Sequence, residues 1–367
     1  MKHIKIILIG FLFQLAKACQ FTFNDSTSLI CSNTSFISQL SSYTNLTQLS
    51  LINTDLIDLP DLSANHHLTI LHLDNNKIQL LTRNYSSVEY LYLTSNHIYV
   101  LHLLNLSYPN LKLLDLSHNP IEHIVEDFFS NQRFPRLEIL KLTNSLKHIN
   151  PYLIDNRFIS FSTLNYLQEI HFDENDFDEF SCSKNITYIQ WNLSANLKKI
   201  IFSKNRLDSF DEHCFAQIRN ITELNLEHNL LKSMPNLNFT LPYLSKLRLD
   251  YNSFDRIPSN LFDLTPQLNE LNLSVNPFNL KSKKQNHLPN SLKILHLNSI
   301  STTNFPCSLF NNLNQLEELY LVNLSSQQID NCIWKKLTRL RIVSFPCHLF
   351  DKYQTVNEIK QKKNLIL

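Results

Sequence analysis

Three groups of side chains in this chain are of the types that bind metal ions or polyanions. The histidine pair at residues 66–67 has no acidic or cysteine partner at the spacing of a metal site. The acidic run at residues 173–179 lacks the glycine and the ordered alternation of a calcium loop. The lysines within residues 281–284 are too few for a nucleic-acid surface. We therefore predict solvated surface at all three places, with no metal, no cofactor and no nucleic-acid partner.

Composition argues against catalysis as well. The chain has one glycine, Gly10, so it cannot form a glycine-rich phosphate loop, a dinucleotide fingerprint or the usual nucleophile elbow. Its 33 basic and 32 acidic residues leave the formal charge near zero. The remaining histidines and acids are scattered rather than held at catalytic spacings. We predict that the protein is not an enzyme.

The element that positions all these side chains is a repeat of the form Leu-x-x-Leu-x-Leu-x-x-Asn. Thirteen versions occur between Leu46 and Phe345, and one copy buries too little apolar surface to fold alone. The second leucine of each copy recurs every 20 to 30 residues, which predicts a solenoid of stacked repeats. These markers are Leu49, Leu71, Leu91, Leu114, Leu140, Ile170, Ile200, Leu224, Leu247, Leu271, Leu295, Leu319 and Leu340.

Each copy alternates in the manner of a half-buried strand. In Leu71, His72 and Leu73 the leucines point inward and the histidine faces solvent. An asparagine at the ninth position suits a tight turn, since its amide can bond to unpaired backbone groups. We predict a ladder of the following amides: Asn76, Asn96, Asn119, Asn175, Asn205, Asn229, Asn252 and Asn276.

The residue after each marker should face one way along the stack. This row reads Ser50, His72, Tyr92, Asp115, Lys141, His171, Ile201, Asn225, Arg248, Asn272, His296, Tyr320 and Arg341. Aromatic and charged side chains together are typical of surfaces that recognise proteins. Our candidate ligand-binding residues are Tyr90, Tyr92, Asp115, Lys141 and His171.

The copy from Leu244 to Leu264 carries Ile257-Pro258 followed by Leu261-Phe262. Two later copies repeat this signature, as Phe305-Pro306 with Leu309-Phe310 and as Phe345-Pro346 with Leu349-Phe350. In these features the chain resembles the extracellular leucine-rich repeat proteins, a family that includes Toll-type receptor ectodomains, chondroadherin and the small leucine-rich proteoglycans. The resemblance implies an α/β fold, a right-handed horseshoe-shaped solenoid of about 13 repeats. Parallel strands would line its concave face, with short helices, 3-10 turns and loops on the convex face.

The first residues have the pattern of a secretory leader. Lys2 and Lys5 precede an apolar run at residues 6–15, and Ala16 and Ala18 stand at the positions that a signal peptidase reads. We predict cleavage after Ala18. No later stretch reaches membrane-spanning length, so we expect a secreted, extracellular product. The predicted divisions are a signal peptide at 1–18, an N-terminal cap at 19–45, the repeat domain at 46–350 and a partial repeat or tail at 351–367.

Eleven Asn-x-Ser/Thr sites support a glycosylated secreted protein. They are Asn24, Asn33, Asn45, Asn84, Asn105, Asn185, Asn192, Asn220, Asn238, Asn272 and Asn323. Asn272 lies between two inward leucines, so a glycan there would obstruct the inner wall near the tenth copy. We therefore expect ligand contacts on the second to seventh copies.

Two disulfide pairs follow from repeat phase. Cys182 and Cys214 lie 12 and 14 residues after their markers, and Cys307 and Cys332 lie 12 and 13 residues after theirs. Near-equal phase in adjacent copies brings two cysteines within bridging distance. Cys347 is left over, either as a buried free thiol or as the bridge of a disulfide-linked dimer.

The two ends differ from each other. The resemblance implies that Cys19 and Cys31 form the N-terminal cap, as one bridge closing a short hairpin. The multi-cysteine C-terminal cap that is common in the family is absent. Either the chain is a shortened form of a longer receptor, or the polar residues 361–363 cap the last turn.

Two function classes fit these observations. The first is a secreted module that recognises a protein ligand through its concave face, as a soluble relative of Toll-type receptors. The alternative is a structural matrix component that resembles chondroadherin or the small leucine-rich proteoglycans.

Overall fold

The computed structural model describes residues 19–21, 27–32, 34–102, 106–149, 158–182, 190–278, 287–300, 307–324 and 331–344. Two compact units divide the chain. Unit 1 comprises Met1–Asn175 and Ile186–Ser194, and unit 2 comprises Asp176–Asn185 and Ala195–Leu367. The predicted leader, the tail at 351–367 and Cys347 lie outside the described residues. Within the ranges given above, no helix has both the length and the apolar character needed to cross a membrane.

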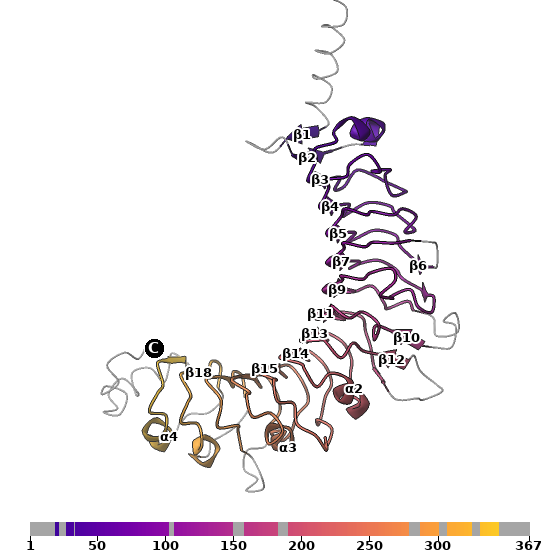
Figure 1. Cartoon of the computed structure of the whole chain (residues 1–367). Helices are drawn as coiled ribbons and strands as arrows, with labels where there is room; N and C mark the ends of the chain where they lie inside the picture. Colours follow the sequence, from indigo (N-terminus) through magenta and orange to yellow (C-terminus); the bar gives the residue numbers. More distant parts are fainter. Residues whose placement is uncertain are drawn as a thin grey trace, which may run out of the picture. The chain divides into compact units, whose positions relative to one another are not determined.

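Unit 1 is a parallel β-solenoid that begins with an antiparallel hairpin. The hairpin strands β1 and β2 pair Cys19 opposite Cys31, and β2 then pairs in parallel with β3. The sheet continues in the order β4, β5, β7, β9 and β11, seen side by side in Figure 1. Its elements are β1 (Cys19–Phe21), β2 (Ser28–Cys31), η1 (Thr34–Ser42), β3 (Gln48–Ser50), β4 (Ile70–His72), β5 (Tyr90–Tyr92), β7 (Leu113–Asp115), β9 (Ile139–Lys141) and β11 (Glu169–His171).

Two further strand pairs lie off the main sheet of unit 1. Strand β6 (Val100–Leu101) pairs with β8 (His123–Ile124), and β10 (Phe158–Ser160) pairs with β12 (Gln190–Asn192). The sequence led us to expect helices, 3-10 turns or loops there. These strands occur in only some copies, so they leave no recurring spacing in the sequence.

Between the strand positions that pair in register from Ile200 to Val343, unit 2 repeats every 23 or 24 residues, and four of its outer segments form short helices. Its elements are β13 (Lys199–Ile201), α2 (Glu212–Gln217), β14 (Glu223–Asn225), β15 (Lys246–Arg248), α3 (Ser259–Phe262), β16 (Glu270–Asn272), β17 (Ile294–His296), η3 (Cys307–Phe310), β18 (Glu318–Tyr320), α4 (Asn331–Lys336) and β19 (Ile342–Ser344). The phenylalanines Phe262 and Phe310 of the Leu-Phe signature are buried, and Phe350 lies outside the described residues. Strands β13 to β19 pair in parallel in chain order.

The observed register confirms a parallel-strand solenoid and corrects one marker. Neighbouring strands place successive markers opposite each other, as with Leu247 and Leu271. In the last copy, however, Val343 and not Leu340 lies opposite Leu319. Leu340 is the first leucine of its copy, and Ser344 therefore takes the outward position that we had given to Arg341. The error arose because Leu340 also fits the second-leucine spacing.

The asparagine ladder forms as predicted. The Nδ2 of Asn119 donates to the carbonyls of Leu93 and Leu116 at 2.9 Å, and its Oδ1 accepts from Ile98 N at 3.0 Å. Each amide therefore ties its own copy to the preceding one, and it satisfies buried backbone groups that would otherwise cost free energy. Asn229 and Asn252 make equivalent bonds in unit 2.

The backbone just before the ladder position is left-handed in copy after copy, with φ between 50° and 60°. Glycine normally fills such positions, but none is present in this part of the chain. Asparagine and other short polar residues tolerate this region best, whereas a β-branched residue is strained there. The residues are Asn53, Asn75, Ser95, His118, Asn144 and Glu174 in unit 1, and Lys204, His228, Tyr251, Val275, Ser299 and Asn323 in unit 2.

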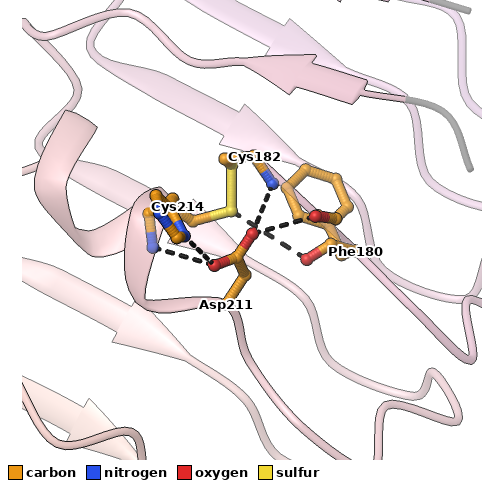
Figure 2. The surroundings of a disulfide bond; sticks show 6 residues. Phe180, Cys182, Asp211 and Cys214 are labelled. Carbon is orange, nitrogen blue, oxygen red and sulfur yellow. Dashed lines mark hydrogen bonds and ion pairs between the residues drawn. A yellow bond between two sulfur atoms is a disulfide. The ribbon is translucent and has the colours of Figure 1, made fainter. Parts of the chain in front are cut away.

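A disulfide joins Cys182 to Cys214 in unit 2, with their Cα atoms 5.0 Å apart (Figure 2). This is the pair that repeat phase predicts. Asp211 caps α2 beside the bond and accepts from Cys182 N and His213 N, both at 2.9 Å. Burial alone would raise the pKa of Asp211, but hydrogen bonds from His213, Ser181 and Cys182 lower it to about 2. The capping carboxylate thus stays ionised and holds the disulfide segment to the helix.

The other predicted bridges are described only in part. Cys31 and Cys307 are each disulfide-bonded. Their predicted partners, Cys19 and Cys332, are among the residues whose side chains are not described.

Candidate ligand-binding surface

All five candidate ligand-binding residues lie on one face of the unit 1 sheet. The register sets Tyr92 opposite Asp115, Asp115 opposite Lys141, and Lys141 opposite His171. Tyr90 lies two residues before Tyr92 on β5, so it faces the same way. We call the outward residues of β4 to β11 the unit 1 strand face: Ile70, His72, Asp74, Tyr90, Tyr92, Thr94, Leu113, Asp115, Ser117, Ile139, Lys141, Thr143, Glu169, His171 and Asp173.

An aromatic pair occupies the β4–β5 part of this face. The rings of His72 and Tyr92 stack with centroids 4.4 Å apart and planes 7° from parallel. His72 Nδ1 also lies 3.5 Å from an Asp74 carboxylate oxygen. Partial burial raises the pKa of Tyr92, although Lys141 opposes this shift. The phenol therefore stays protonated at neutral pH and can donate a hydrogen bond to a ligand.

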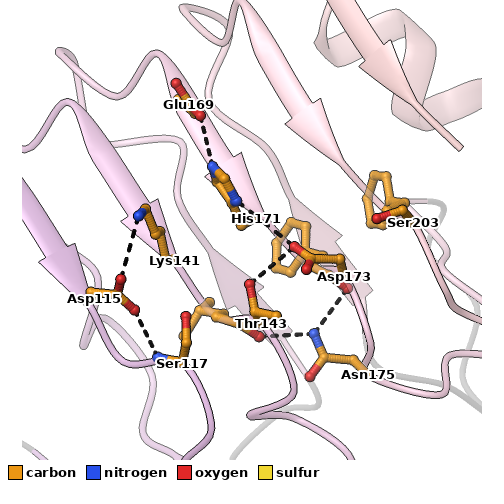
Figure 3. A network of polar contacts seen from close by, with 12 residues as sticks. Asp115, Ser117, Lys141, Thr143, Glu169, His171, Asp173, Asn175 and Ser203 are labelled. Carbon is orange, nitrogen blue, oxygen red and sulfur yellow. Dashed lines mark hydrogen bonds and ion pairs between the residues drawn. The ribbon is translucent and has the colours of Figure 1, made fainter. Parts of the chain in front are cut away.

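A buried carboxylate and a lysine form the centre of the face (Figure 3). Asp115 is 7% exposed, and its Oδ2 lies 3.4 Å from Lys141 Nζ. Its other oxygen accepts from Ser117 N at 3.0 Å. Because both oxygens are held, the pair presents a fixed ammonium beside a fixed carboxylate.

The β11 end of the face holds a histidine between two acids. His171 Nε2 lies 2.7 Å from Glu169 Oε1, and His171 Nδ1 lies 3.8 Å from Asp173 Oδ1 (Figure 3). Thr143 Oγ1 donates to Asp173 at 3.0 Å. Burial raises the pKa of Asp173, while the Thr143 hydrogen bond and His171 act in the opposite direction. The network orients four polar side chains from two adjacent copies of the repeat.

The sequence reasoning missed Glu169 as a member of this network, and it assigned Asp173 to a solvated acidic run. The structure places Asp173 half-buried with a threonine partner. The signal was present in the sequence, because residues two positions either side of His171 share its face of a strand.

The matching face of unit 2 is different in kind. Arg248 pairs with Glu227 at 3.3 Å, and Lys246 pairs with Glu270 at 3.0 Å. Asp250 is 7% exposed, and burial, followed by repulsion from Glu227, raises its pKa to about 6. The sequon residue Asn272 is half-buried on β16, and its Oδ1 accepts from Ser274 N.

The predicted sequons are distributed as follows. Asn45, Asn84, Asn220, Asn238 and Asn323 are exposed, whereas Asn192 and Asn272 are half-buried. Asn24, Asn33, Asn105 and Asn185 lie outside the described residues. No sequon falls on the unit 1 strand face defined above. Across the portion of the chain that the structure covers, no group of three or more His, Cys, Asp or Glu side chains is arranged to hold a metal ion.

Solved structures with the same fold are leucine-rich repeat proteins. One from Leptospira interrogans superposes with a TM-score of 0.60 at 21% identity, covering 92% of this chain and 88% of its own. The chain therefore has the leucine-rich repeat fold. Mouse RP105, solved with MD-1, follows with a TM-score of 0.58 at 18% identity, over 82% of this chain and 50% of its own. The receptor in a TLR13–ssRNA13 complex gives 0.53 at 20% identity, over 84% and 50%.

No family model matches the chain. Several curated proteins are similar to it in sequence over part of its length. Mouse osteomodulin is 29% identical over 36% of this leucine-rich repeat chain and 30% of its own length. A zebrafish transforming growth factor beta activator, LRRC33, is 26% identical over 74% of this chain and 41% of its own. Toll-like receptor 3 of Boselaphus tragocamelus is 29% identical over 36% and 16%. The chain spans about a third to a half of the length of the first relatives it matches.

Proposed function

We propose that this leucine-rich repeat protein is a secreted, receptor-like module that recognises a protein ligand through its unit 1 strand face. One observation carries the proposal. Asp115, Lys141, His171 and their neighbours are held in place by hydrogen bonds and ion pairs on adjacent strands, next to the half-buried tyrosines of β5. Side chains fixed before binding lose little conformational freedom on contact, and Tyr is frequent among residues that dominate interfaces.

The location of the sequons supports the same face. A glycan on Asn272 would stand on the strand face of unit 2, whereas the unit 1 strand face carries no sequon. Similarity to LRRC33 and to Toll-like receptor 3 favours the receptor-like reading. Secretion rests on the leader pattern at residues 1–18 and on the eleven sequons. Catalysis and nucleic-acid binding form no part of the proposal.

A matrix role is the second candidate, and the similarity to osteomodulin favours it. In that case the partner would be a fibrous matrix component rather than a soluble or membrane-bound ligand. Both hypotheses place binding on the unit 1 strand face. They differ in the class of partner and not in the residues that contact it.

The test uses the full chain produced by a secreting cell line and immobilised through a C-terminal tag. Proteins captured from extracellular fluid and from solubilised matrix are identified by mass spectrometry. Capture is repeated with the double variant Tyr92→Ala/Lys141→Ala. Tyr166→Ala is the matched control, since Tyr166 is 58% exposed and lies outside the strands of unit 1.

We expect the wild-type chain to capture one soluble or cell-surface protein. The double variant should capture at least tenfold less of that protein, and Tyr166→Ala should capture as much as the wild type. If the double variant captures the same partner in the same amount as the wild type, the partner does not bind through the unit 1 strand face. Capture confined to fibrous matrix proteins would favour the second candidate.

Absence of the protein from the medium would contradict secretion, and retention of residues 1–18 in the secreted protein would contradict cleavage after Ala18. A disulfide-linked dimer through Cys347 is proposed separately, and a non-reducing gel with and without thiol tests it.

A further inference from the structure

An apolar area adjoins the aromatic pair on the unit 1 sheet. Ile30 on β2 lies opposite Ser50, in the same row as His72 and Tyr92, and it is 50% exposed. Ile52, two residues beyond Ser50, is 40% exposed. Isoleucines at outward sheet positions are unfavourable in water unless a partner covers them. We call Ile30, Ile52, Ile70 and the His72–Tyr92 stack the apolar end.

The rest of the face has an acidic excess. Its outward positions hold four carboxylates and one lysine: Asp74, Asp115, Glu169, Asp173 and Lys141. With histidine neutral, this excess attracts a cationic partner and repels nucleic acid, sulfated glycans and anionic lipid.

Three of these carboxylates are fixed in direction. Asp74 Oδ1 accepts from Thr94 N at 2.9 Å, Asp115 from Ser117 N at 3.0 Å, and Asp173 from Thr143 Oγ1 at 3.0 Å. Two of the donors belong to an adjacent copy of the repeat. A rigid row of acids can therefore pair with cations without first losing side-chain freedom.

We propose that the unit 1 strand face binds a basic polypeptide segment, which rests an apolar side chain on the apolar end and directs Lys or Arg toward the acids of β7 to β11. This deepens the proposed function and depends on it. From β2 to β11 there are six strand spacings of about 4.8 Å, or roughly 29 Å. About nine extended residues span that length. The partner is thus a protein with an exposed apolar and basic stretch of this size.

The test selects ligands from a random nonapeptide phage library on the immobilised full chain at 50 mM NaCl. We expect the enriched peptides to carry a positive formal charge and an aliphatic or aromatic residue toward one end. The affinity of the best one should fall at least fivefold on raising NaCl to 300 mM, because screening weakens exposed ion pairs.

Variants locate the bound peptide. Glu169→Gln/Asp173→Asn removes two charges but keeps the hydrogen-bonding shape, so it should weaken binding of the best peptide at least tenfold with an unchanged Tm. Ile52→Ser should weaken it at least threefold. Asp58→Asn is the control, since Asp58 is an exposed acid outside the strands of unit 1, and it should leave the affinity unchanged.

The outcomes separate this inference from the proposed function. Enrichment of neutral or acidic peptides that lose binding with Tyr92→Ala would overturn the basic-partner inference and leave the face in use. If basic peptides are enriched but bind Tyr92→Ala and Glu169→Gln/Asp173→Asn with unchanged affinity, the assigned face would be overturned as well. Failure to enrich any peptide would overturn the inference, while the capture experiment would still decide the proposed function.

Discussion

Unit 1 and unit 2 share the same inner turn but complete the rest of each copy differently. In unit 1 the marker spacing ranges from 20 to 30 residues, and the additional short strands β6, β8, β10 and β12 pair on the outer side. In unit 2 the spacing is 23 or 24 residues, and the outer segments form the short helices α2, α3, η3 and α4. The inner turn is therefore fixed by the repeat itself, whereas the outer structure varies from copy to copy.

The strand faces of the two units differ as well. The unit 1 strand face joins an apolar end to acids that are held by hydrogen bonds, and it bears no sequon. The face of unit 2 pairs lysine and arginine with acids, and it includes Asn272 and the buried carboxyl of Asp250, whose pKa is raised to about 6. Four predictions test how far this contrast extends.

The largest effect should come from removing the disulfide of unit 2 with Cys182→Ala/Cys214→Ala. The two cysteines are 32 residues apart, and a closed loop of that length stabilises by about 3 to 4 kcal/mol through the unfolded state. Hydrogen exchange should show lost protection in unit 2 peptides near α2 and unchanged protection around β4 and β5. Equal loss in both units would show that they do not open separately.

The ladder should matter equally in both units. Asn229→Leu leaves the carbonyls of Phe202 and Leu226 and the amide of Leu207 without their bonds, which should cost roughly 2 to 3 kcal/mol. Asn119→Leu is the matched change in unit 1 and should cost the same amount. Urea unfolding measures both. If one substitution costs less than half as much as the other, the two units do not share one inner turn.

Asp250 should make unit 2 sensitive to pH. Its folded pKa of about 6 lies above its ordinary value of 3.8, so the ionised form destabilises the fold. The penalty is absent below about pH 4, grows between pH 4 and 6, and is complete above pH 6. Asp250→Asn should therefore raise the free energy of unfolding by roughly 2 kcal/mol at pH 7.5 and not at pH 4.

Asp115→Asn provides the contrast for Asp250→Asn in unit 1. It removes a carboxylate that pairs with Lys141 at 3.4 Å, so it should give no gain at either pH. A gain of similar size from both substitutions would show that the two buried acids are in equivalent environments.

The smallest effect concerns the left-handed turn. Val275 has a φ of 54°, a conformation that a β-branched side chain disfavours. Val275→Asn should stabilise the protein by about 0.5 to 1 kcal/mol, and the reciprocal Asn75→Val should destabilise it by about 1 kcal/mol. Paired thermal melts measure both changes. A loss on Val275→Asn would mean that packing of the valine outweighs its backbone strain.

Repetition explains which parts of the fold the sequence predicts. Twelve markers and the buried amides follow from one recurring spacing. A marker misplaced in one copy would therefore be out of phase with the copies before and after it. The last copy has no following neighbour, and there the spacing selects Leu340 as the marker, three residues before the true position at Val343. The strand pairs β6–β8 and β10–β12 escape prediction because they occur in only some copies, so no recurring spacing marks them.

The candidate surface was predictable in part for the same reason. Alternation correctly put Tyr92, Asp115, Lys141 and His171 in one row. It also put Glu169 and Asp173 beside His171, although the acidic composition of that stretch had suggested solvent. The outward position of Ile30 follows from the pairing of β2 with β3. Strand β2 precedes the first copy of the repeat, so the repeat spacing could not predict this position.

The glycine-free turns have a consequence for chemical ageing. Asparagine loses its amide fastest when glycine follows it, because the unhindered next nitrogen closes a succinimide ring. No asparagine in this chain precedes a glycine, and two ladder residues, Asn119 and Asn276, precede proline, which has no such nitrogen to offer. A protein whose copies are joined through side-chain amides thus lacks the dipeptide that converts those amides to acids fastest.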